Sequence, residues 1–249
     1  MDSLQAAIIQ ARFGSTRLPG KVLKQLTDRS VLSHVIERCR ATRGIDTVCC
    51  AIPNTEDSDG VAREAERCGA TVVRGSETDV LGRFKVAADA IGATIIMRVT
   101  SDCPLSDPDI NARVLGLLAA EGADYACNNM PPAWPHGLDC EAFTRSALDR
   151  AAQQSSDPYE REHVTPWLRT QAGVKRAALP GPGGEAASMR WTLDFPEDME
   201  LFRAVFAHLP AGPAIPGYDA VMAVLTKHPE ITAINAHKGD RGLATMPKA

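Results

Sequence analysis

Apolar, strand-like runs alternate with helix-like segments through the first half of the chain. The runs are "AAIIQA", "TVCCAIP", "ATVVRG" and "TIIMRVT". They are apolar on both faces and dense in β-branched residues, which is typical of parallel strands covered by helices on both sides. Apolar residues at helical spacing predict helices over 31–40, 62–68, 80–91 and 110–120. This order predicts an α/β fold, a Rossmann-like α/β/α sandwich with a mostly parallel central sheet.

The second half of the chain has a less regular pattern. "GLDCEAF" predicts a strand that opens a short helix, and "PYEREHVTPWLRTQ" predicts another helix, which Pro166 either starts or kinks. "MRWTLDFPEDMELFRAVFAHL" predicts a strand, a turn and a helix. The polar tail after Ile234 is expected to be mobile. Because there is no internal repeat or low-complexity block, residues 1–249 are predicted to form one domain.

Composition excludes several classes of protein. A chain of 249 residues with 44% hydrophobic content can bury a sizeable core. The net charge of -4 argues against a nucleic-acid partner, because such proteins gain affinity by neutralising phosphates. The seven cysteines show neither disulfide nor zinc-ligand spacing, so reduced thiols are expected. With no apolar run long enough for a membrane span and no signal-peptide pattern, we expect no membrane partner and a cytoplasmic location.

A cationic, flexible loop follows the first strand-like run. It reads "ARFGSTRLPGKVL", from Ala11 to Leu23, and its cations and small residues are Arg12, Gly14, Ser15, Arg17 and Lys21. The loop is not a Walker motif, because "STRLP" separates its glycines and Val22 follows Lys21, and it is not a dinucleotide fingerprint. Backbone N–H groups, two guanidinium groups and an ammonium still suit a polyphosphate. The alternative interpretation is a solvated basic turn.

Two aspartates follow apolar runs at distant points of the sequence. Asp102 follows "TIIMRVTS" and Asp194 follows "MRWTL". If both runs are parallel strands, both carboxylates face the same crevice, where a divalent cation would offset their repulsion. Carboxylate oxygens suit Mg²⁺. The alternatives are a turn aspartate in "SDCPLSDPD" for Asp102 and the N-cap of the "PEDMELF" helix for Asp194.

Five ordered motifs carry a family resemblance. They are "IIQARFGSTRLPGKVL", "DVLGRF", "RVTSDCPLSDPD", "REHVTP" and "RWTLDFPEDMELF", and they extend from Ile8 to Phe202. The chain resembles the cytidylyltransferase family that contains the SpsF-type proteins of spore-coat polysaccharide synthesis, and more distantly the CMP-KDO and CMP-sialic acid synthetases. The resemblance implies a fold of the nucleotide-diphospho-sugar transferase type. It also implies transfer of CMP from CTP to a sugar or sugar acid, with release of pyrophosphate.

The resemblance also implies roles for individual residues. Arg12, Ser15 and Lys21 would hold the triphosphate, and Asp102 and Asp194 would hold Mg²⁺, for which Mn²⁺ would substitute. The catalytic set is Arg12, Lys21 and Asp102. The nucleotide-binding set is Ala11, Arg12, Gly14, Ser15, Arg17, Lys21, Arg74, Arg98 and Asp102. For Arg98 a structural ion pair is the alternative, and Asp79, near Arg74, is expected to cap the helix that begins at Val80.

The acceptor half of the site is expected in the second half of the chain. The expected acceptor-binding residues are Asn129, His136, Asp139, Glu141 and Arg161. Arg161 lies in the "REHVTP" motif and would face a substrate carboxylate, a subunit contact or a structural salt bridge. Related synthetases are dimers, so a homodimer is expected, with 125–185 as an acceptor-binding and dimerisation subregion. His34 lies beside an apolar helical face and is interpreted as a packing residue.

Departures from the family pattern limit what the resemblance implies. Ser101 stands where closer members often have glycine, and Cys103 stands where KDO synthetases carry an acidic residue, so KDO itself is not inferred as the acceptor. One alternative is a GT-A-like glycosyltransferase, which should show an Asp-X-Asp signature, whereas "TSDCP" supplies one aspartate. The other alternative is a catalytically silent nucleotide-binding subunit, which would have lost a metal ligand or Lys21.

Overall fold

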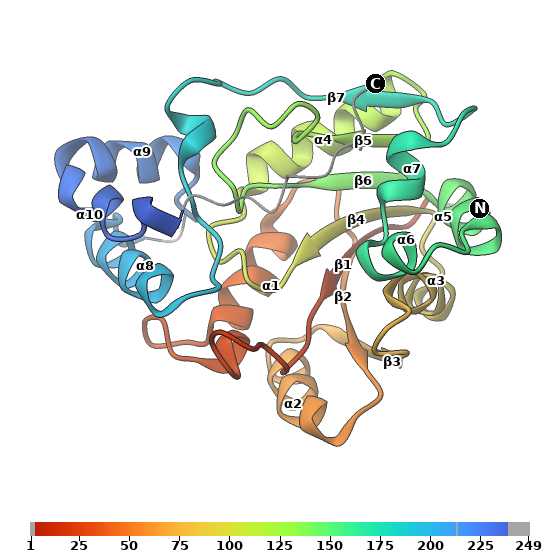
Figure 1. The fold of residues 1–249 in the computed structure, drawn as a ribbon, viewed down its shortest axis with the longest axis horizontal. Helices are drawn as coiled ribbons and strands as arrows, with labels where there is room; N and C mark the ends of the chain where they lie inside the picture. Colours follow the sequence, from red (N-terminus) through yellow and green to blue (C-terminus); the bar gives the residue numbers. More distant parts are fainter. Residues whose placement is uncertain (1–2, 213, 239–249) are drawn as a thin grey trace.

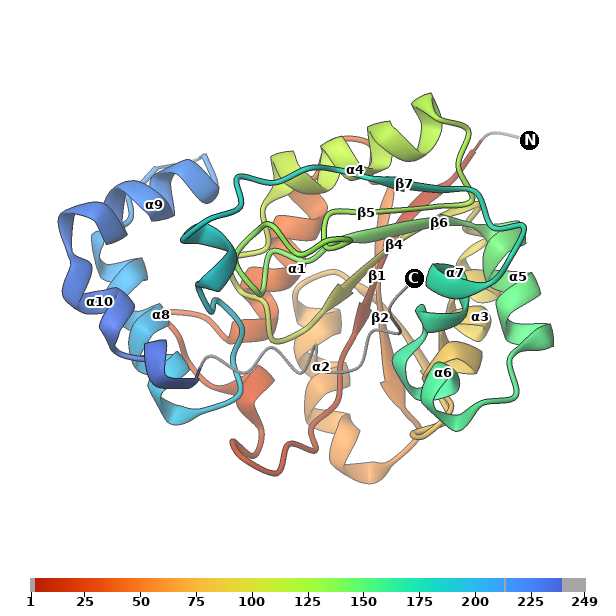
Figure 2. The same cartoon turned by 45° about the horizontal axis from the view of Figure 1, so that its top comes forward.

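The central element of the protein is a seven-stranded sheet with the strand order β3-β2-β1-β4-β6-β5-β7 (Figure 1). The computed structural model describes residues 3–212 and 214–238. Helices cover the sheet on both sides, and a group of three further helices lies beside it (Figure 2). The predicted α/β/α sandwich is confirmed.

The first four strands form the parallel half of the sheet, as predicted. They are β1 (Gln5–Gln10), β2 (Thr47–Pro53), β3 (Thr71–Gly75) and β4 (Ile95–Thr100). β1 is central to this half, because it pairs in parallel with both β2 and β4. The loops after β1 and β4 therefore leave the sheet side by side, at the carboxyl ends of the strands.

The other half of the sheet is mixed. Its strands are β6 (Glu141–Thr144), β5 (Tyr125–Cys127) and β7 (Arg176–Ala178). β6 pairs antiparallel with both β4 and β5, whereas β5 and β7 are parallel to each other. Among the described strands, β6 alone runs against the others. The predicted strand in "GLDCEAF" is confirmed as β6, and β5 and β7 are additions that the sequence pattern did not predict.

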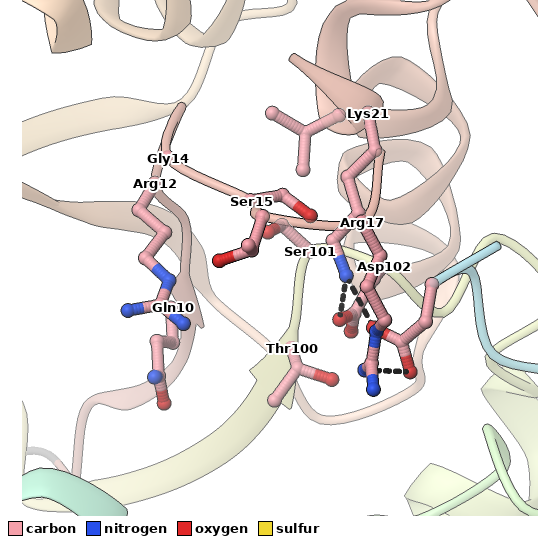
Figure 3. Close-up of a pocket in the computed structure, with 12 residues that line it drawn as sticks. Gln10, Arg12, Gly14, Ser15, Arg17, Lys21, Thr100, Ser101 and Asp102 are labelled. Carbon is pink, nitrogen blue, oxygen red and sulfur yellow. Dashed lines mark hydrogen bonds and ion pairs between the residues drawn. The ribbon is translucent and has the colours of Figure 1, made fainter. Parts of the chain in front are cut away.

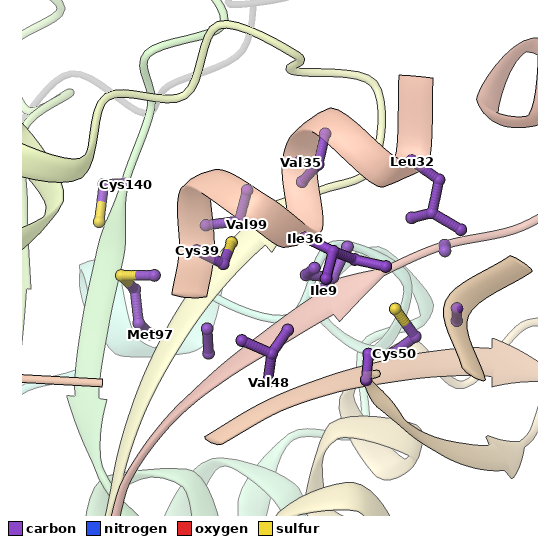
Figure 4. Packing of buried hydrophobic residues seen from close by; sticks show 14 of the residues in the cluster. Ile9, Leu32, Val35, Ile36, Cys39, Val48, Cys50, Met97, Val99 and Cys140 are labelled. Atoms are coloured by element: carbon purple, nitrogen blue, oxygen red, sulfur yellow. The ribbon is translucent and has the colours of Figure 1, made fainter. Parts of the chain in front are cut away.

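The two faces of the sheet bury different residues of the same strands. On one face, Ala7 and Ile9 of β1 pack with α1 (Val31–Ala41), α2 (Asp59–Arg67) and α4 (Pro108–Ala120), and Figure 4 shows part of this cluster. On the other face, Ala6 and Ile8 pack with α3 (Val80–Ile91), α5 (Arg145–Gln154) and α7 (Pro166–Thr170). This arrangement explains the continuous apolar runs of β1, β2 and β4, since both sides of these strands are buried.

The predicted helix over "PYEREHVTPWLRTQ" is wrong as a single element. Two short helices take its place, α6 (Pro158–His163) and α7 (Pro166–Thr170). Val164 between them has a φ of 71°, in the left-handed region. The backbone of Val164 leaves the helical region, which ends the first helix. Pro166 has no N–H to donate, which suits the first turn of the second helix, where that N–H would have no partner.

A C-terminal helical group packs beside the sandwich (Figure 2). It comprises α8 (Pro196–His208), α9 (Tyr218–Lys227) and α10 (Pro229–Ala233). Short 3-10 helices occur at Lys21–Leu23, Glu56–Ser58, Ala186–Ser188 and Ala236–Lys238. Buried His34 of α1 contacts Phe206 of α8, with 4.6 Å between ring centroids, as its interpretation as a packing residue requires. The tail predicted to be mobile lies, after residue 238, outside the described residues.

The predicted strand over "MRWTL" is wrong. Residues 189–193 are extended but stay outside the sheet, where the Trp191 N–H donates to the His136 carbonyl at 2.6 Å. Trp191 and Leu193 are buried in the core of the C-terminal helical group. The alternation of apolar residues in this segment therefore serves that core and not a sheet. No helix in the described part of the chain is both long and apolar enough to cross a bilayer.

Candidate active site

The cationic loop after β1 lines a cavity of about 330 Å³. The lining residues are Gln10, Arg12, Gly14, Ser15, Thr16, Arg17, Lys21, Val22, Thr100, Ser101, Asp102 and Asp194. We call this space the loop cavity. Gln10 and Thr100 are register partners at the ends of β1 and β4, so both strands open into the cavity. The loop turns back at Gly20, whose φ of 64° favours glycine, and the Gly20 N–H donates to the Phe13 carbonyl at 3.3 Å.

Cations stand on both sides of the loop cavity. Figure 3 shows Arg12 on one side and Lys21, Arg17 and Asp102 grouped on the other. The exposed Arg12 side chain has no ion-pair or hydrogen-bond partner among the described residues. Arg17 is 57% exposed and reaches Asp194 at 3.4 Å. These two guanidinium groups are available to an anionic ligand.

Lys21 bridges the two aspartates that were predicted to converge. Its Nζ lies 2.8 Å from Asp102 Oδ2, 2.8 Å from Asp194 Oδ1 and 2.6 Å from the Leu193 carbonyl oxygen. Burial alone would lower the pKa of Lys21, but the two carboxylates raise it above its ordinary value. Burial raises the pKa of Asp194, but Lys21 and Arg190 lower it further. The net pKa of Asp194 lies well below its usual range. The lysine is therefore a charged bridge between two ionised carboxylates.

Asp194 reaches Asp102 by a route that the sequence did not predict. Because residues 189–193 are not a strand, the carboxylates do not meet as the ends of two parallel strands. Instead the Leu193 N–H donates to the Asp102 carbonyl at 2.9 Å, which holds the two segments together. The alternative role of Asp194 as a helix cap is also wrong, because Asp198 caps α8 by accepting from the N–H groups of Asp194 and Phe195 at 2.8 and 2.9 Å.

The acid pair fits a metal that is shared with a ligand. The described residues contain no group of three or more His, Cys, Asp or Glu side chains able to hold a metal ion. Mg²⁺, however, commonly binds one or two carboxylates and completes its shell with waters and substrate phosphates. Asp102 and Asp194 both line the loop cavity, across which Arg12 lies. Their donor set suits a cation that arrives with a polyphosphate.

A second cavity, of about 310 Å³, adjoins the loop cavity. Its lining residues are Arg98, Thr100, Asp102, Cys103, Asn129, His136, Asp139, Glu141, Arg169, Thr192 and Asp194. We call this space the polar cavity. Thr100, Asp102 and Asp194 line both cavities, so the bridged acid pair stands where the two spaces meet.

A buried ion cluster forms one wall of the polar cavity. Glu141 is 3% exposed, and its carboxylate contacts Arg98 Nη1 at 2.5 Å and Arg169 Nη2 at 2.6 Å. The Tyr125 hydroxyl donates to the same carboxylate at 2.5 Å. Burial raises the pKa of Glu141, but Arg169 and Arg98 lower it further, so the net pKa lies well below its usual range. Two guanidinium groups against one carboxylate leave the cluster with one net positive charge.

Two polar atoms at the polar cavity have no partner within the described residues. They are His136 Nδ1 and Arg98 Nε, and both are buried. His136 is fixed by its backbone, which pairs with residues 189 and 191. Gly137 makes this pairing possible, because a Cβ there would lie 2.1 Å from the Trp191 carbonyl oxygen. Buried polar atoms without partners are costly, which distinguishes these two atoms from the satisfied groups of the Glu141 cluster.

The structure groups most of the predicted site residues and leaves out three. The loop cavity contains Arg12, Gly14, Ser15, Arg17, Lys21, Asp102 and Asp194. The polar cavity contains Arg98, Asn129, His136, Asp139 and Glu141. Ala11 is fully buried and lines neither cavity. Arg74 pairs with Asp59 at 2.6 Å, and Arg161 pairs with Asp79, which caps α3 as predicted.

Arg98 and Glu141 differ from their predicted placement. Arg98 was assigned to the nucleotide but lines the polar cavity, where it also forms the structural ion pair that was its alternative. Glu141 was assigned to polyol hydroxyls, yet both of its oxygens are engaged by protein donors.

Several lining residues were missed by the sequence analysis. They include Gln10, Thr16, Thr100, Thr192 and Arg169. Tyr125 lines neither cavity but was also missed as a partner of Glu141. Gln10 and Thr100 could have been found, because each ends a predicted parallel strand. Arg169 and Tyr125 had no such signal, since they reach Glu141 only through the fold.

Comparisons with known proteins agree on one family. The family model described as Cytidylyltransferase matches residues 6–208. The spore coat polysaccharide biosynthesis protein SpsF of Bacillus subtilis is 30% identical over 230 residues, covering 90% of this chain and 94% of that protein. A 3-deoxy-manno-octulosonate cytidylyltransferase of Anaeromyxobacter dehalogenans is 27% identical over 240 residues, covering 81% and 97%. A solved cytidylyltransferase structure from Leptospira borgpetersenii superposes with a TM-score of 0.86 at 29% identity, covering 93% and 97%.

Proposed function

The chain belongs to the cytidylyltransferase family, and from this premise we propose that it transfers CMP from CTP to a hydroxyl of a sugar acid and releases pyrophosphate. The chain is thus a CTP-dependent nucleotidyltransferase, and the acceptor is the part that we add. The single observation that carries the proposal is the meeting of two polar cavities at the Asp102–Lys21–Asp194 bridge. Nucleotidyl transfer needs such a boundary, because donor and acceptor must touch at one phosphorus atom.

The loop cavity is the nucleotide side in this proposal. Arg12, Arg17 and Lys21 supply positive charge where negative charge develops on the departing pyrophosphate. Gly14 and Ser15 offer backbone N–H groups and a hydroxyl to phosphate oxygens. Asp102 and Asp194 would hold Mg²⁺, which supplies charge neutralisation at the phosphates, and Mn²⁺ is expected to substitute for it.

The polar cavity is the acceptor side. The net positive charge of the Arg98–Glu141–Arg169 cluster suits one carboxylate of an acceptor. Asn129, His136 and Asp139 line the same space and offer hydrogen bonds to hydroxyl groups. Asp102 stands between the acceptor and the phosphates, in a position to orient the attacking hydroxyl. An acceptor with one carboxylate and several hydroxyls is a sugar acid.

The proposal extends to the cellular location, the oligomeric state and the pathway. We place the enzyme in the cytoplasm as a homodimer, acting in the synthesis of a surface polysaccharide or glycan, in line with the name of its Bacillus subtilis relative. Residues 125–185, which carry β5, β6, α5, α6, α7 and β7, remain the proposed acceptor-binding and dimerisation subregion. Mass measurement in solution tests the dimer.

The decisive experiment measures pyrophosphate release with CTP, UTP, ATP and GTP against a panel of sugar acids. Each acid is paired with the matching sugar in which the carboxylate is reduced to an alcohol. We expect release with CTP and at least one acid, and a large loss with its reduced partner. Release that is equal for acid and reduced sugar would contradict the acceptor assignment, and release with another nucleotide alone would contradict the assignment of CTP.

A further inference from the structure

Arg190 holds the side of Asp194 that faces away from Lys21. Its Nη2 lies 2.7 Å from Asp194 Oδ2, whereas Lys21 contacts Oδ1. The Arg190 side chain is 6% exposed and lines neither the loop cavity nor the polar cavity. It therefore acts on the site only through Asp194.

Arg190 is itself fixed by a buried network of the C-terminal helical group. Asp198 is fully buried and accepts from Arg190 Nε at 3.1 Å and Nη2 at 3.2 Å. Asn235 donates to Asp198 Oδ1 at 2.8 Å and to the Arg190 carbonyl at 3.0 Å. A planar guanidinium with several donors can satisfy both aspartates at once, which an ammonium cannot do with the same geometry.

The same network fixes the backbone of Asp194. Asp198 Oδ2 accepts from the Asp194 N–H at 2.8 Å and from the Phe195 N–H at 2.9 Å. The buried Arg190–Asp198 pair thus contacts both the main chain and the side chain of Asp194. Arg17 also approaches Asp194 Oδ2, at 3.4 Å, but it is 57% exposed and free to turn toward a ligand.

We propose that Arg190 is a positioning residue, which with Asp198 and Asn235 aims Oδ1 of Asp194 at Asp102 and keeps the acid pair converged when Lys21 and Arg17 turn toward phosphates. The proposal rests on the function proposed above, since it gives the acid pair its role as a cation site. In this proposal the C-terminal helical group contributes to catalysis, because α8 carries Asp198 and the segment after α10 carries Asn235.

The test compares Arg190→Lys with Arg203→Lys, a matched change at an exposed arginine of α8. Mn²⁺ is titrated into protein saturated with CTP, and free Mn²⁺ is followed by electron paramagnetic resonance with CTP alone as the blank. Loss of a partner that orients a metal ligand typically weakens metal binding by roughly 10- to 100-fold, and we expect that range for Arg190→Lys. We expect kcat to fall with it, the KM for CTP to stay within about twofold, and excess Mg²⁺ to restore part of kcat. Arg203→Lys should match the wild type throughout.

Asn235→Ala provides a second variant, because it removes only the outer hydrogen bonds and leaves both charges in place. It should weaken Mn²⁺ binding in the same direction but by less, and it carries the test if Arg190→Lys does not fold. Wild-type Mn²⁺ affinity in the variants, with a loss of thermal stability alone, would overturn the proposal and leave the network structural. That result differs from failure of the proposed function, in which the wild-type protein itself releases no pyrophosphate from any donor and acceptor pair.

Discussion

Both cavities contain arginines, but the arginines of the two cavities differ in exposure and in pairing. In the loop cavity, Arg12 has no partner among the described residues and Arg17 is 57% exposed. In the polar cavity, Arg98 and Arg169 are each 15% exposed and are both tied to Glu141. Arg12 and Arg17 of the loop cavity are therefore available to an anionic ligand, although Lys21 in the same cavity is neutralised by two aspartates. Both arginines of the polar cavity share the counter-charge of Glu141. This difference agrees with the proposed placement of a polyanionic donor in the loop cavity and of an acceptor with a single negative charge in the polar cavity.

The sheet topology produces this difference. Parallel strands β1 and β4 end side by side, and the loop after β1 leaves the sheet there, with Arg12 and Arg17 exposed. β6 runs antiparallel to β4, and the pairing places Glu141 directly opposite Arg98. A cross-strand ion pair forms there without any loop. The antiparallel pairing of β4 with β6 thus explains why Arg98 is paired within the protein.

The largest effect is expected from Lys21→Ala, which tests the loop cavity. The change removes the charge that the proposal assigns to the departing pyrophosphate and leaves Asp102 and Asp194 to repel each other. Loss of one such group in an active site typically lowers turnover by roughly 100- to 1000-fold, and we expect kcat in the pyrophosphate assay to fall within that range.

Lys24→Ala is the matched control for this change, because Lys24 is exposed and lies outside the loop cavity. It should leave kcat unchanged. Circular dichroism should show that both variants are folded. Near-wild-type kcat for Lys21→Ala at saturating CTP would remove Lys21 from the reaction and reduce its bridge to a structural contact.

Glu141→Gln tests the polar cavity and is expected to affect stability first. Removing the counter-charge leaves two buried guanidinium groups uncompensated, and breaking a buried pair in this way costs about 3 kcal/mol of unfolding free energy. The KM for CTP should change by less than about twofold, because Glu141 does not line the loop cavity. Acceptors with two negative charges should gain relative to those with one.

Urea unfolding and acceptor kinetics measure these effects, with Glu200→Gln as the control at an exposed glutamate of α8. If Glu141→Gln unfolds at the wild-type urea concentration, the cluster is not the tight charge pair described above. If the acceptor preference stays the same, the cluster does not contact the acceptor. The difference in charge pairing between the two cavities would then not explain how donor and acceptor are distinguished.

The parallel half of the fold could be predicted because local patterns determine it. The sequences of β1 to β4 are apolar runs. Ser30 and Asp79 directly precede α1 and α3 and are their N-cap residues, and both residue types are visible in the sequence. β5 and β7 have three residues each, too few to show a period, and they exist because neighbouring strands pair with them. The extended segment at 189–193 has the sequence pattern of a strand, since burial in a helical core gives the same apolar alternation.

The candidate site also contains one part that local sequence predicts and one part that only tertiary contacts form. The residues of the first loop are consecutive, so their charges and glycines are visible as a motif. The polar cavity is assembled from β4, β6, α7 and the loops around residues 129 and 192, and only tertiary contacts bring these together. Arg169 and Arg190 illustrate the consequence, because their roles depend on buried partners that no spacing in the sequence announces.

His34 offers a smaller test, at a junction that belongs to neither cavity. It joins α1 to α8, and burial, with help from Arg29 and Arg38, lowers its pKa to about 4. An unfolded histidine titrates near its ordinary pKa of 6.5, so the unfolded state binds the proton first as the pH falls. Stability is therefore expected to decrease below pH 6.5 and down to about pH 4, by about 2 kcal/mol at pH 5 relative to pH 8.

Urea unfolding of wild type and His34→Gln at pH 8 and pH 5 checks this expectation. The difference between the two pH values should shrink in His34→Gln and persist in the control His163→Gln, which changes an exposed histidine of α6. An equal acid effect in wild type and His34→Gln would assign the loss of stability to other groups and leave the junction between α1 and α8 insensitive to pH.

The smallest effect is expected at Arg74, and it sharpens the boundary of the loop cavity. Arg74 and Arg12 look alike in the sequence, because each lies at or just after the end of a parallel strand. Arg74 is on β3, at the edge of the sheet and two strands from β1, where it pairs with the exposed Asp59. A surface pair of this kind contributes less than about 1 kcal/mol, so Arg74→Ala should leave both stability and the KM for CTP nearly unchanged. Arg12→Ala, the matched change inside the cavity, should raise the KM for CTP roughly tenfold through loss of a charged hydrogen bond. Equal increases in KM for the two variants would mean that the nucleotide extends across β2 to the sheet edge. Arg74 would then leave Asp59 to bind the nucleotide, and pairing within the protein would not separate the binding arginines from the others.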